Sequence, residues 1–344
     1  MFKALASLAA GLRALIQGLV TRFFTEPVQF PSGRKVTPIK LLAEGGFSFV
    51  YSATELSTGR QFALKKMICQ DSEAKTSARD EAEVHEKFSH RNLLPIEDKL
   101  FQRHPTNQSW EICWFVFPLC SCSLRDEITQ QVLYEQIGKE RVPGLWGLSK
   151  VVHLMSGVCC GLQEMHRQGV SHRDVKPENV LLQLEDGASP PGRPVLMDFG
   201  SCGRAEVHVR SRREALQETE TAARLCTMQY RAPELFDVPS DSGVLSYALA
   251  DVWSAGCTLY CCMLGYSPFE VEYDQQARPR QVETGHLRAL APIPWPREGP
   301  RETVPAWFKE LVRGILAVNP KDRPPIGQVL QHLSNAPSGD CDRV

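Results

Sequence analysis

The run from His172 to Asn179 brings a carboxylate, an ammonium and an amide close together in sequence, at Asp174, Lys176 and Asn179. A carboxylate can accept the proton of an alcohol, and an ammonium can meet negative charge on a phosphoryl group. An amide oxygen can bind Mg²⁺. Phosphoryl transfer needs such positioning and charge neutralisation more than it needs covalent chemistry. These residue types are compatible with the transfer of a phosphoryl group to a hydroxyl.

The same run resembles the catalytic loop of protein kinases, and a chance match of this length is negligible. The resemblance implies that Asp174 is the catalytic base, that Lys176 meets the charge on the transferred phosphoryl and that Asn179 binds Mg²⁺. Asp198-Phe199-Gly200 follows the apolar run Val195-Leu196-Met197, 24 residues after Asp174. It matches a second kinase motif, in which Asp198 is the other metal ligand.

A glycine-containing segment near the N-terminus resembles the loop that covers the nucleotide phosphates in kinases. Ala43 and Ser48 replace the first and third glycines of the kinase pattern, whereas the central Gly45 is kept. Lys65 follows at the right distance to hold the α- and β-phosphates of ATP. The residues that we expect to bind the nucleotide here are Ala43, Glu44, Gly45, Gly46, Phe47, Ser48, Val50, Ala63 and Lys65.

A lysine that holds phosphates needs a carboxylate to position it, and Glu81 is our preferred candidate. Glu81 lies on the one helix expected in this part of the chain, nine residues before His90-Arg91-Asn92-Leu93, which resembles the segment that follows this helix in kinases. Glu83 and Glu86 are the alternative partners for Lys65. If none of the three has a function, these glutamates simply form a solvated face of the helix.

The segment from Phe115 to Cys120 is expected to be the last strand of the first lobe and the linker that binds adenine. Pro118 would supply only its carbonyl, so that its missing N–H has no cost there. Cys120 would offer its backbone N–H and C=O. A simple edge strand is the alternative interpretation.

The activation segment would run from Asp198 to Ala232-Pro233-Glu234. In kinases that act on serine and threonine, a threonine near its end bridges to the catalytic aspartate and lysine, and Thr227 matches it. Glu234 is expected to pair with Arg323. Asp251 is expected to brace the backbone of the catalytic loop.

Regulation by phosphorylation is possible for this segment, because Arg173 precedes the catalytic aspartate and could meet a phosphate. The candidate acceptors are Ser211, Thr219 and Thr221. Three glutamates of the same stretch could supply negative charge without modification: Glu214, Glu218 and Glu220. We therefore expect at least basal activity without an upstream kinase.

The elements that must position these residues show two periodicities. Between residues 30 and 119 the pattern favours strands such as Phe47–Ala53 and Gln61–Met67, interrupted by a helix at Ser77–Phe88. Beyond Leu124 it is mostly helical, as at 148–168 and 250–264. This order predicts an α+β chain with a β-rich lobe at about 27–119 and a mainly helical lobe at about 120–336, and the kinase resemblance implies that these form the bilobal kinase fold, with a kinase domain at 27–336. Residues 337–344 are expected to be a disordered tail.

Composition excludes some classes of function. The formal net charge is −1, from 39 Lys and Arg against 40 Asp and Glu, so no nucleic-acid partner is expected. The 12 cysteines include no pair with zinc spacing, and we expect free, buried thiols in a reducing compartment.

Several segments resemble the Numb-associated kinase family: Glu44 to Ser48, Pro194 to Asp198, Arg224 to Thr227 and Tyr230 to Phe236. The resemblance implies a serine/threonine kinase of protein substrates, dependent on ATP and Mg²⁺, on Golgi or other secretory membranes. It also implies a helical elaboration around the activation segment. The lipid anchor of the family's short member is absent as written, since Phe2 stands where myristoylation needs glycine and no cysteine precedes Cys69.

Residues 1–26 show apolar residues at three- and four-residue steps, with basic residues and no acid before Glu26. Such an amphipathic helix could lie at a membrane surface, pack on the kinase or be a mitochondrial presequence, and we rank the alternatives in that order. The alternative function for the chain is a pseudokinase scaffold. The presence of Lys65, Asp174, Asn179 and Asp198 favours an active enzyme.

Overall fold

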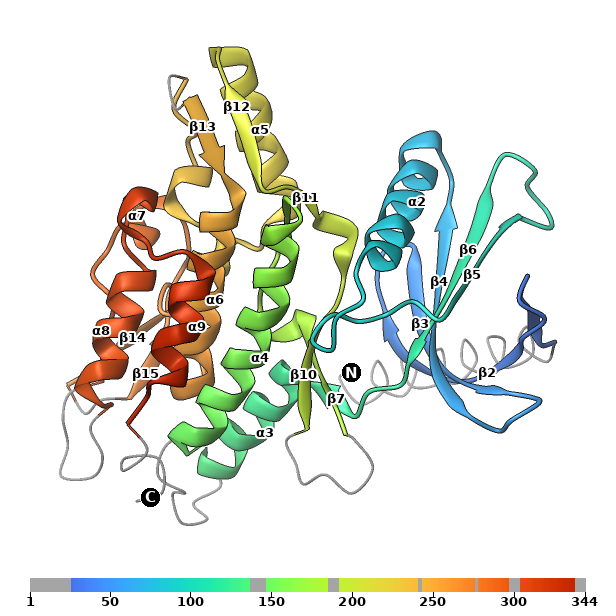
Figure 1. Cartoon of the computed structure of the whole chain (residues 1–344), viewed down its shortest axis with the longest axis horizontal. Coiled ribbons are helices and arrows are strands. Elements are labelled where there is room, and N and C mark those ends of the chain that lie inside the picture. The colour runs from blue at the N-terminus through green and yellow to red at the C-terminus, as the bar shows by residue number, and fades with distance from the viewer. Residues whose placement is uncertain are drawn as a thin grey trace, which may run out of the picture. The chain divides into compact units, whose positions relative to one another are not determined.

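The computed structural model describes residues 26–136, 147–184, 192–240, 243–275, 278–296 and 304–337. The chain divides into two compact units. Of the described residues, 26–86 and 95–119 belong to the first, and 87–94 and those between 120 and 337 belong to the second. The first unit is a sheet with a helix and the second is mainly helical, which confirms the predicted α+β class (Figure 1). Residues 1–25 and 338–344, for which we predicted an amphipathic extension and a tail, lie outside the described residues.

The first unit is built on one antiparallel sheet with the strand order β1-β2-β3-β4-β6-β5. Its elements are β1 (Val28–Gln29), β2 (Lys35–Glu44), β3 (Ser48–Glu55), β4 (Gln61–Cys69), α2 (Ser72–Lys87), β5 (Asp98–Arg103) and β6 (Glu111–Pro118). Side chains alternate between the faces of a strand, so Phe62 and Leu64 of β4 enter the same core as Trp114 and Val116 of β6.

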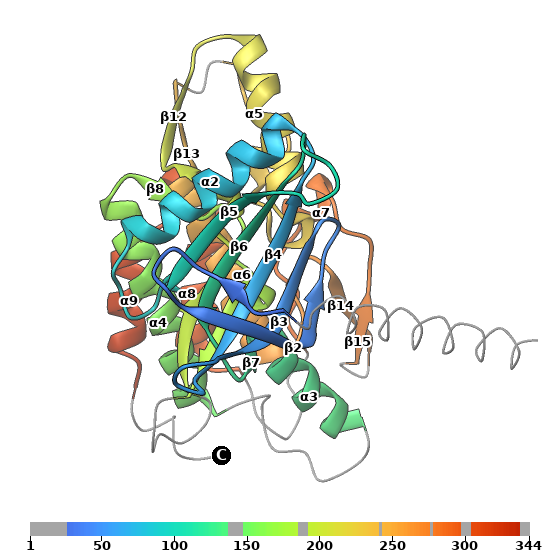
Figure 2. The ribbon, with the colours of Figure 1, turned by 90° about the vertical axis from the view of Figure 1, so that its right-hand side faces the viewer.

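Helix α2 presents one face to this sheet. Its buried residues Ala78, Glu81, Ala82 and His85 are three and four positions apart and therefore share a side of the helix. The ring of His85 lies 4.8 Å from the ring of Phe117 on β6, and Figure 2 shows α2 crossing the strands. The helix starts five residues earlier than we predicted, because the carboxylate of Asp71 accepts a hydrogen bond from Ala74 N and caps its first turn.

The described part of the second unit contains seven α-helices, one of them a single short turn, and several small sheets of two or three strands. Its helices are α3 (Leu124–Gln136), α4 (Leu148–Arg167), α5 (Arg212–Leu225), α6 (Tyr247–Leu264), α7 (His286–Ala289), α8 (Ala306–Ile315) and α9 (Ile326–Ser334). Its strands are β7 (Cys122–Ser123), β8 (Val170–Ser171), β9 (Val180–Gln183), β10 (Arg193–Leu196), β11 (Gly203–Arg204), β12 (Glu206–Val209), β13 (Gly243–Ser246), β14 (Val271–Tyr273) and β15 (Pro279–Gln281). The predicted helices at 148–168 and 250–264 correspond to α4 and α6, and Ser246 caps α6 three residues earlier than expected.

The antiparallel pair β9–β10 positions the chemistry, because it aligns Val180 with Leu196. The residues on either side of this pair meet as a result: Met197 N donates to Asn179 O at 2.9 Å. β10 packs against α4 at the position of Gly157 in the helix. A Cβ on Gly157 would lie 2.4 Å from Pro194 Cγ, so a larger residue there would push the strand away.

Each cysteine in the described part of the chain is a free thiol. Among the described helices, none combines the length and the apolar character needed to cross a membrane.

Candidate active site

In the first unit, Lys65 of β4 and Glu81 of α2 form an ion pair. Lys65 Nζ lies 2.6 Å from Glu81 Oε1, and the two side chains are 17% and 6% exposed. Of the other two carboxylates considered, Glu83 is exposed and Glu86 pairs with Lys99 at 2.6 Å. Burial places Glu81 on the sheet side of the helix, so it is the carboxylate that orients Lys65.

The glycine-containing segment forms the turn of the β2–β3 hairpin. Gly45 N donates to Ser48 O at 2.8 Å, and the residues from Ala43 to Phe47 are all exposed. Ser48 Oγ lies 3.0 Å from the position of a Cβ on Gly45, so the serine hydroxyl covers the glycine backbone. The turn is open to solvent, as a loop that covers phosphates must be.

The remaining residues predicted to bind nucleotide lie on the neighbouring strands. Val50 of β3 is opposite Lys65 of β4, and Ala63 is opposite Ser52 and Phe117. Pro118 is the last residue of β6, and the division between the two units falls between Leu119 and Cys120. The alternative that this segment is an edge strand is wrong, because β6 pairs with β4 on one side and with β5 on the other.

In the second unit, the side chains predicted to act on the acceptor meet at Asp174. Lys176 Nζ donates to Asp174 Oδ2 at 2.7 Å and to Thr227 Oγ1 at 2.7 Å, and Thr227 Oγ1 donates to Asp174 Oδ1 at 2.6 Å. The amide of Asn179 donates to Asp174 Oδ2 at 3.0 Å and to its backbone oxygen at 2.8 Å. Residues 53 positions apart thus close one hydrogen-bonded ring around the carboxylate.

This ring decides the protonation state of Asp174. Burial by itself would raise the pKa of the carboxyl, but the hydrogen bonds from Lys176 and Thr227 and the charge of Lys176 outweigh it and hold the pKa below its ordinary value. Asp174 is therefore ionised at neutral pH and can accept a proton.

Asp251 of α6 accepts hydrogen bonds from the backbone of the catalytic loop. The fully buried carboxylate accepts from His172 N at 2.8 Å and from Arg173 N at 2.7 Å, and His166 Nε2 lies 2.8 Å from its Oδ2. Arg173 has φ 70°, a conformation that a non-glycine residue adopts at a cost. The two hydrogen bonds to Asp251 stabilise this strained turn.

Asp198 and Asn179 fit a hard cation such as Mg²⁺, whose preferred ligands are oxygen atoms. Asp198 is exposed and has φ 64°, directly after Met197, which is hydrogen-bonded to Asn179. Because Nδ2 of Asn179 donates to Asp174, its Oδ1 is the amide atom that remains for a cation.

Glu234 and Arg323 form a two-pronged ion pair with both N–O distances at 2.7 Å. The arginine also donates to the carbonyls of Ala317, Val318 and Leu249, so that its whole fork is used. A desolvated pair of this kind positions the end of the activation segment more than it adds stability.

Around the activation segment, the structure accounts for residues whose partners the sequence did not indicate. The guanidinium of Arg173 lies 4.0 Å from the centre of the Tyr247 ring, and Tyr247 OH donates to Glu218 of α5 at 2.7 Å. Of the candidate phosphate acceptors, Ser211 caps α5 and Thr219 donates to Ala215 O. Tyr247 could have been singled out only by knowing that α6 begins beside the catalytic loop.

Comparisons with known proteins agree with this geometry. The family model described as protein kinase domain matches residues 36–333. The chain is 32% identical over 296 residues to serine/threonine-protein kinase 16 from Homo sapiens, which covers 86% of this chain and 88% of the relative. It is 29% identical over 333 residues to serine/threonine-protein kinase ppk13 from Schizosaccharomyces pombe, with 86% and 88% covered.

Proposed function

Because the chain belongs to the protein kinase domain family and is a serine/threonine protein kinase, we propose that Asp174 is the base that accepts the proton of a substrate's serine or threonine hydroxyl. The observation that carries this proposal is the ionised, largely buried carboxylate held by Lys176 and Thr227. Asp174 orients the hydroxyl. Lys176 neutralises the negative charge that develops on the transferred phosphoryl group. Thr227 is hydrogen-bonded to the side chains of Asp174 and Lys176 and fixes their relative position.

As a protein kinase the chain uses ATP and a divalent cation, and ATP supplies the phosphoryl group. We assign Mg²⁺ to Asn179 and Asp198, and the α- and β-phosphates to Lys65, which Glu81 orients. The β2–β3 turn supplies backbone N–H groups for the phosphates, and the backbone of Pro118 and Cys120 supplies the contacts for adenine.

Turnover, as opposed to a scaffold role, is favoured by the state of these residues. Lys65 carries its carboxylate partner, and Asp174 is ionised and hydrogen-bonded. The direct test is incubation of the purified full chain with Mg·ATP and a peptide library, followed by mass spectrometry of the phosphorylated residues. Phosphoserine and phosphothreonine are the expected products. ATP binding without any phosphorylated product would identify a pseudokinase.

Basal activity without an activating phosphate also belongs to this proposal. Arg173 would be the group that meets such a phosphate, yet its guanidinium already stacks on Tyr247, which Glu218 holds. Thr219 lies inside α5 with its hydroxyl bonded to the backbone. Protein freed of phosphate by a phosphatase should therefore still turn over, and its complete inactivity would contradict this part.

We further propose that the enzyme works at the surface of secretory membranes, including the Golgi, in membrane trafficking. The support is the family resemblance and the amphipathic pattern of residues 1–26. Deletion of residues 2–26 should release the protein from anionic vesicles in a sedimentation assay. Unchanged sedimentation would exclude a membrane helix, and import of the full chain into isolated mitochondria would favour the presequence alternative.

A further inference from the structure

Arg125, in the first turn of α3, joins four segments of the second unit. Its Nε donates to Glu178 Oε1 at 2.7 Å and its Nη2 donates to Tyr230 OH at 2.6 Å. Its Nη1 makes two longer contacts of 3.5 Å, to Cys261 Sγ and to Gly265 O. The catalytic loop, the end of the activation segment and the end of α6 are thus held together by one side chain.

The two short hydrogen bonds of Arg125 flank the acceptor chemistry. Glu178 lies four residues after Asp174, and Tyr230 lies three residues after Thr227. Thr227 and Asp174 are hydrogen-bonded to each other. A peptide whose hydroxyl reaches Asp174 must therefore pass close to the site that the guanidinium fills.

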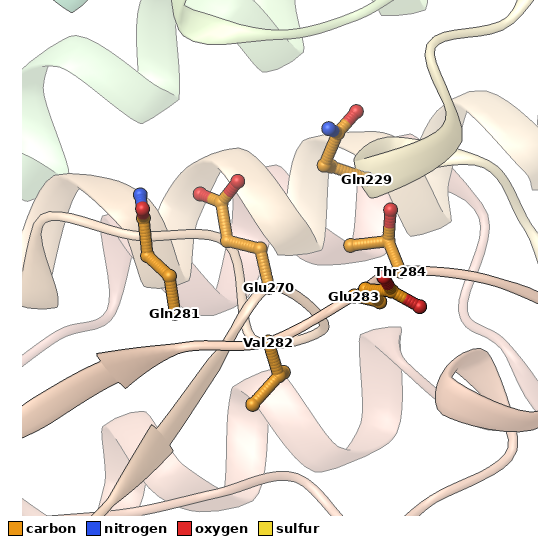
Figure 3. Close-up of a pocket in the computed structure, with 6 residues that line it drawn as sticks. All are labelled: Gln229, Glu270, Gln281, Val282, Glu283 and Thr284. Carbon is orange, nitrogen blue, oxygen red and sulfur yellow. The ribbon is translucent and has the colours of Figure 1, made fainter.

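A hollow lies directly beside the arginine. A cavity of about 320 Å³ is lined by Arg125, Glu178, Glu270 and Gln281 among others. Glu270 and Gln281 also line a neighbouring cavity of about 430 Å³, whose lining residues are drawn in Figure 3. The second cavity includes Gln229, so the hollow continues along the end of the activation segment.

Residues that line the hollow are hydrogen-bonded, through Ser267, to the end of the activation segment, residues 227–230 (the acceptor segment). Ser267 Oγ donates to Gln229 O at 2.7 Å, and Ser267 N donates to Glu270 Oε1 at 2.8 Å. Within the described part of the chain, no cation forms an ion pair with Glu270, whereas Glu178 is paired with Arg125. The acidic groups beside the acceptor segment thus already hold one guanidinium, and it comes from the chain itself.

We propose that Arg125 is a positioning and specificity-determining residue. Its guanidinium occupies the site formed by Glu178 and Tyr230, which would otherwise bind an arginine side chain of the substrate. The inference rests on the proposed phosphorylation of peptides. Glu178 Oε2 is buried and has no hydrogen-bond partner among the described residues, so loss of Arg125 leaves a carboxylate with both oxygens unpaired. Such a carboxylate beside an open hollow attracts a guanidinium from outside.

The test compares wild type with Arg125→Ala on serine peptides that differ only in an arginine placed at each position near the acceptor. Wild type should phosphorylate the neutral and the arginine peptides with kcat/KM values within about threefold of each other, a difference of the size expected for an exposed charge. Arg125→Ala should lose about 10- to 100-fold on the neutral peptide. An arginine peptide, or free guanidinium ion with the neutral peptide, should restore at least about tenfold.

Three further variants separate this role from general damage. Arg125→Lys keeps the charge without the fork, so it should retain more activity than Arg125→Ala on the neutral peptide. Arg125→Ala combined with Glu178→Gln should lose the acquired preference for arginine. Arg278→Ala is the matched control, since the Arg278 side chain is 73% exposed, pairs with Asp274 four residues away and is not among the residues that line the two cavities. This control should behave as wild type.

Two results would overturn the inference: an equal loss of Arg125→Ala on all peptides with no rescue, or a strong preference of wild type for arginine. If Arg125→Ala does not fold, Arg125→Lys carries the test. A lysine lacks the fork that contacts Glu178 and Tyr230 together, so an arginine peptide should compete with it, and the preference of this variant for arginine peptides should exceed that of wild type. Absence of turnover by wild type on every peptide would refute the proposed function instead, so the two failures are distinct.

Discussion

The turn of the β2–β3 hairpin and the catalytic loop are both assigned to the handling of phosphate, yet they are built in opposite ways. Residues 43–47 of the hairpin are exposed, and Phe47 is 62% exposed. In the catalytic loop, His172 is 0% exposed and Asp174 is 9% exposed. The hairpin can therefore yield to a nucleotide at small cost, whereas the loop holds one geometry before any substrate arrives.

The difference teaches where rigidity is needed. A general base must lie within hydrogen-bond reach of its proton, so its position is fixed by buried, fully paired polar groups. A cover over phosphates has only to present backbone N–H groups, so glycine and open space are sufficient. Substitutions in the loop should thus change turnover and stability, and comparable ones in the hairpin should change little but nucleotide affinity.

The largest effect is expected for Asp174→Asn. Loss of the base should lower kcat by about 100- to 10,000-fold, because proton acceptance contributes only in the transition state. The affinity for Mg·ATP, measured by calorimetry, should stay nearly as in wild type. An equally large loss of nucleotide binding would mean that the loop serves the nucleotide as the hairpin does, and the contrast between them would fail.

Asp251→Ala should come next. It leaves the N–H groups of His172 and Arg173 without their acceptor, at a cost of about 1–3 kcal/mol for each orphaned group. Urea unfolding should show the loss, and turnover should fall with it. Asp251→Asn keeps one acceptor oxygen and should be less damaging, and an Asp251→Ala protein as stable as wild type would show that the loop needs no brace.

The same substitution, glycine to alanine, can be made in the hairpin turn at Gly45 and on β11 at Gly203, which packs against Arg173 of the catalytic loop. A Cβ on Gly203 would lie 2.4 Å from Arg173 Cζ, whose guanidinium is held by the Tyr247 ring, so Gly203→Ala should cost about 1–3 kcal/mol. At Gly45 the nearest atom is the rotatable Ser48 hydroxyl at 3.0 Å. Gly45→Ala should change the free energy of unfolding by no more than about 0.5 kcal/mol. Equal costs would contradict the contrast.

The smallest effect is one of pH. The pKa of Asp174 is lower in the folded chain than in the unfolded chain, so the carboxylate stabilises the fold at pH values above the unfolded pKa, about 4. This contribution is lost as the pH falls from there through the folded pKa. The difference in unfolding free energy between wild type and Asp174→Asn should therefore be constant between about pH 6 and about pH 8 and shrink below about pH 4. A difference that changes near neutral pH would show that Asp174 is not held ionised.

The identity of the reacting groups could be predicted from the chain alone. His172 to Asn179 and Asp198 to Gly200 are contiguous runs, and the chemistry of such residues depends on side-chain type and local spacing. The α+β class and the helices at α4 and α6 followed from periodicity, because apolar residues three and four apart share one face of a helix. The starts of α2 and α6 were missed by five and three residues, since the caps at Asp71 and Ser246 depend on single hydrogen bonds.

Only tertiary structure decided which distant groups meet. The choice of Glu81 over Glu83 and Glu86 follows from the face of α2 that the sheet buries. The stacking of Arg173 on Tyr247 and the hydrogen bond of Arg125 to Tyr230 join residues 74 and 105 positions apart, whereas the contact of Thr227 with Asp174 was expected only through the kinase resemblance. No local pattern marks such partners, because hydrophobic packing of helices and strands, and not sequence spacing, brings their backbones together.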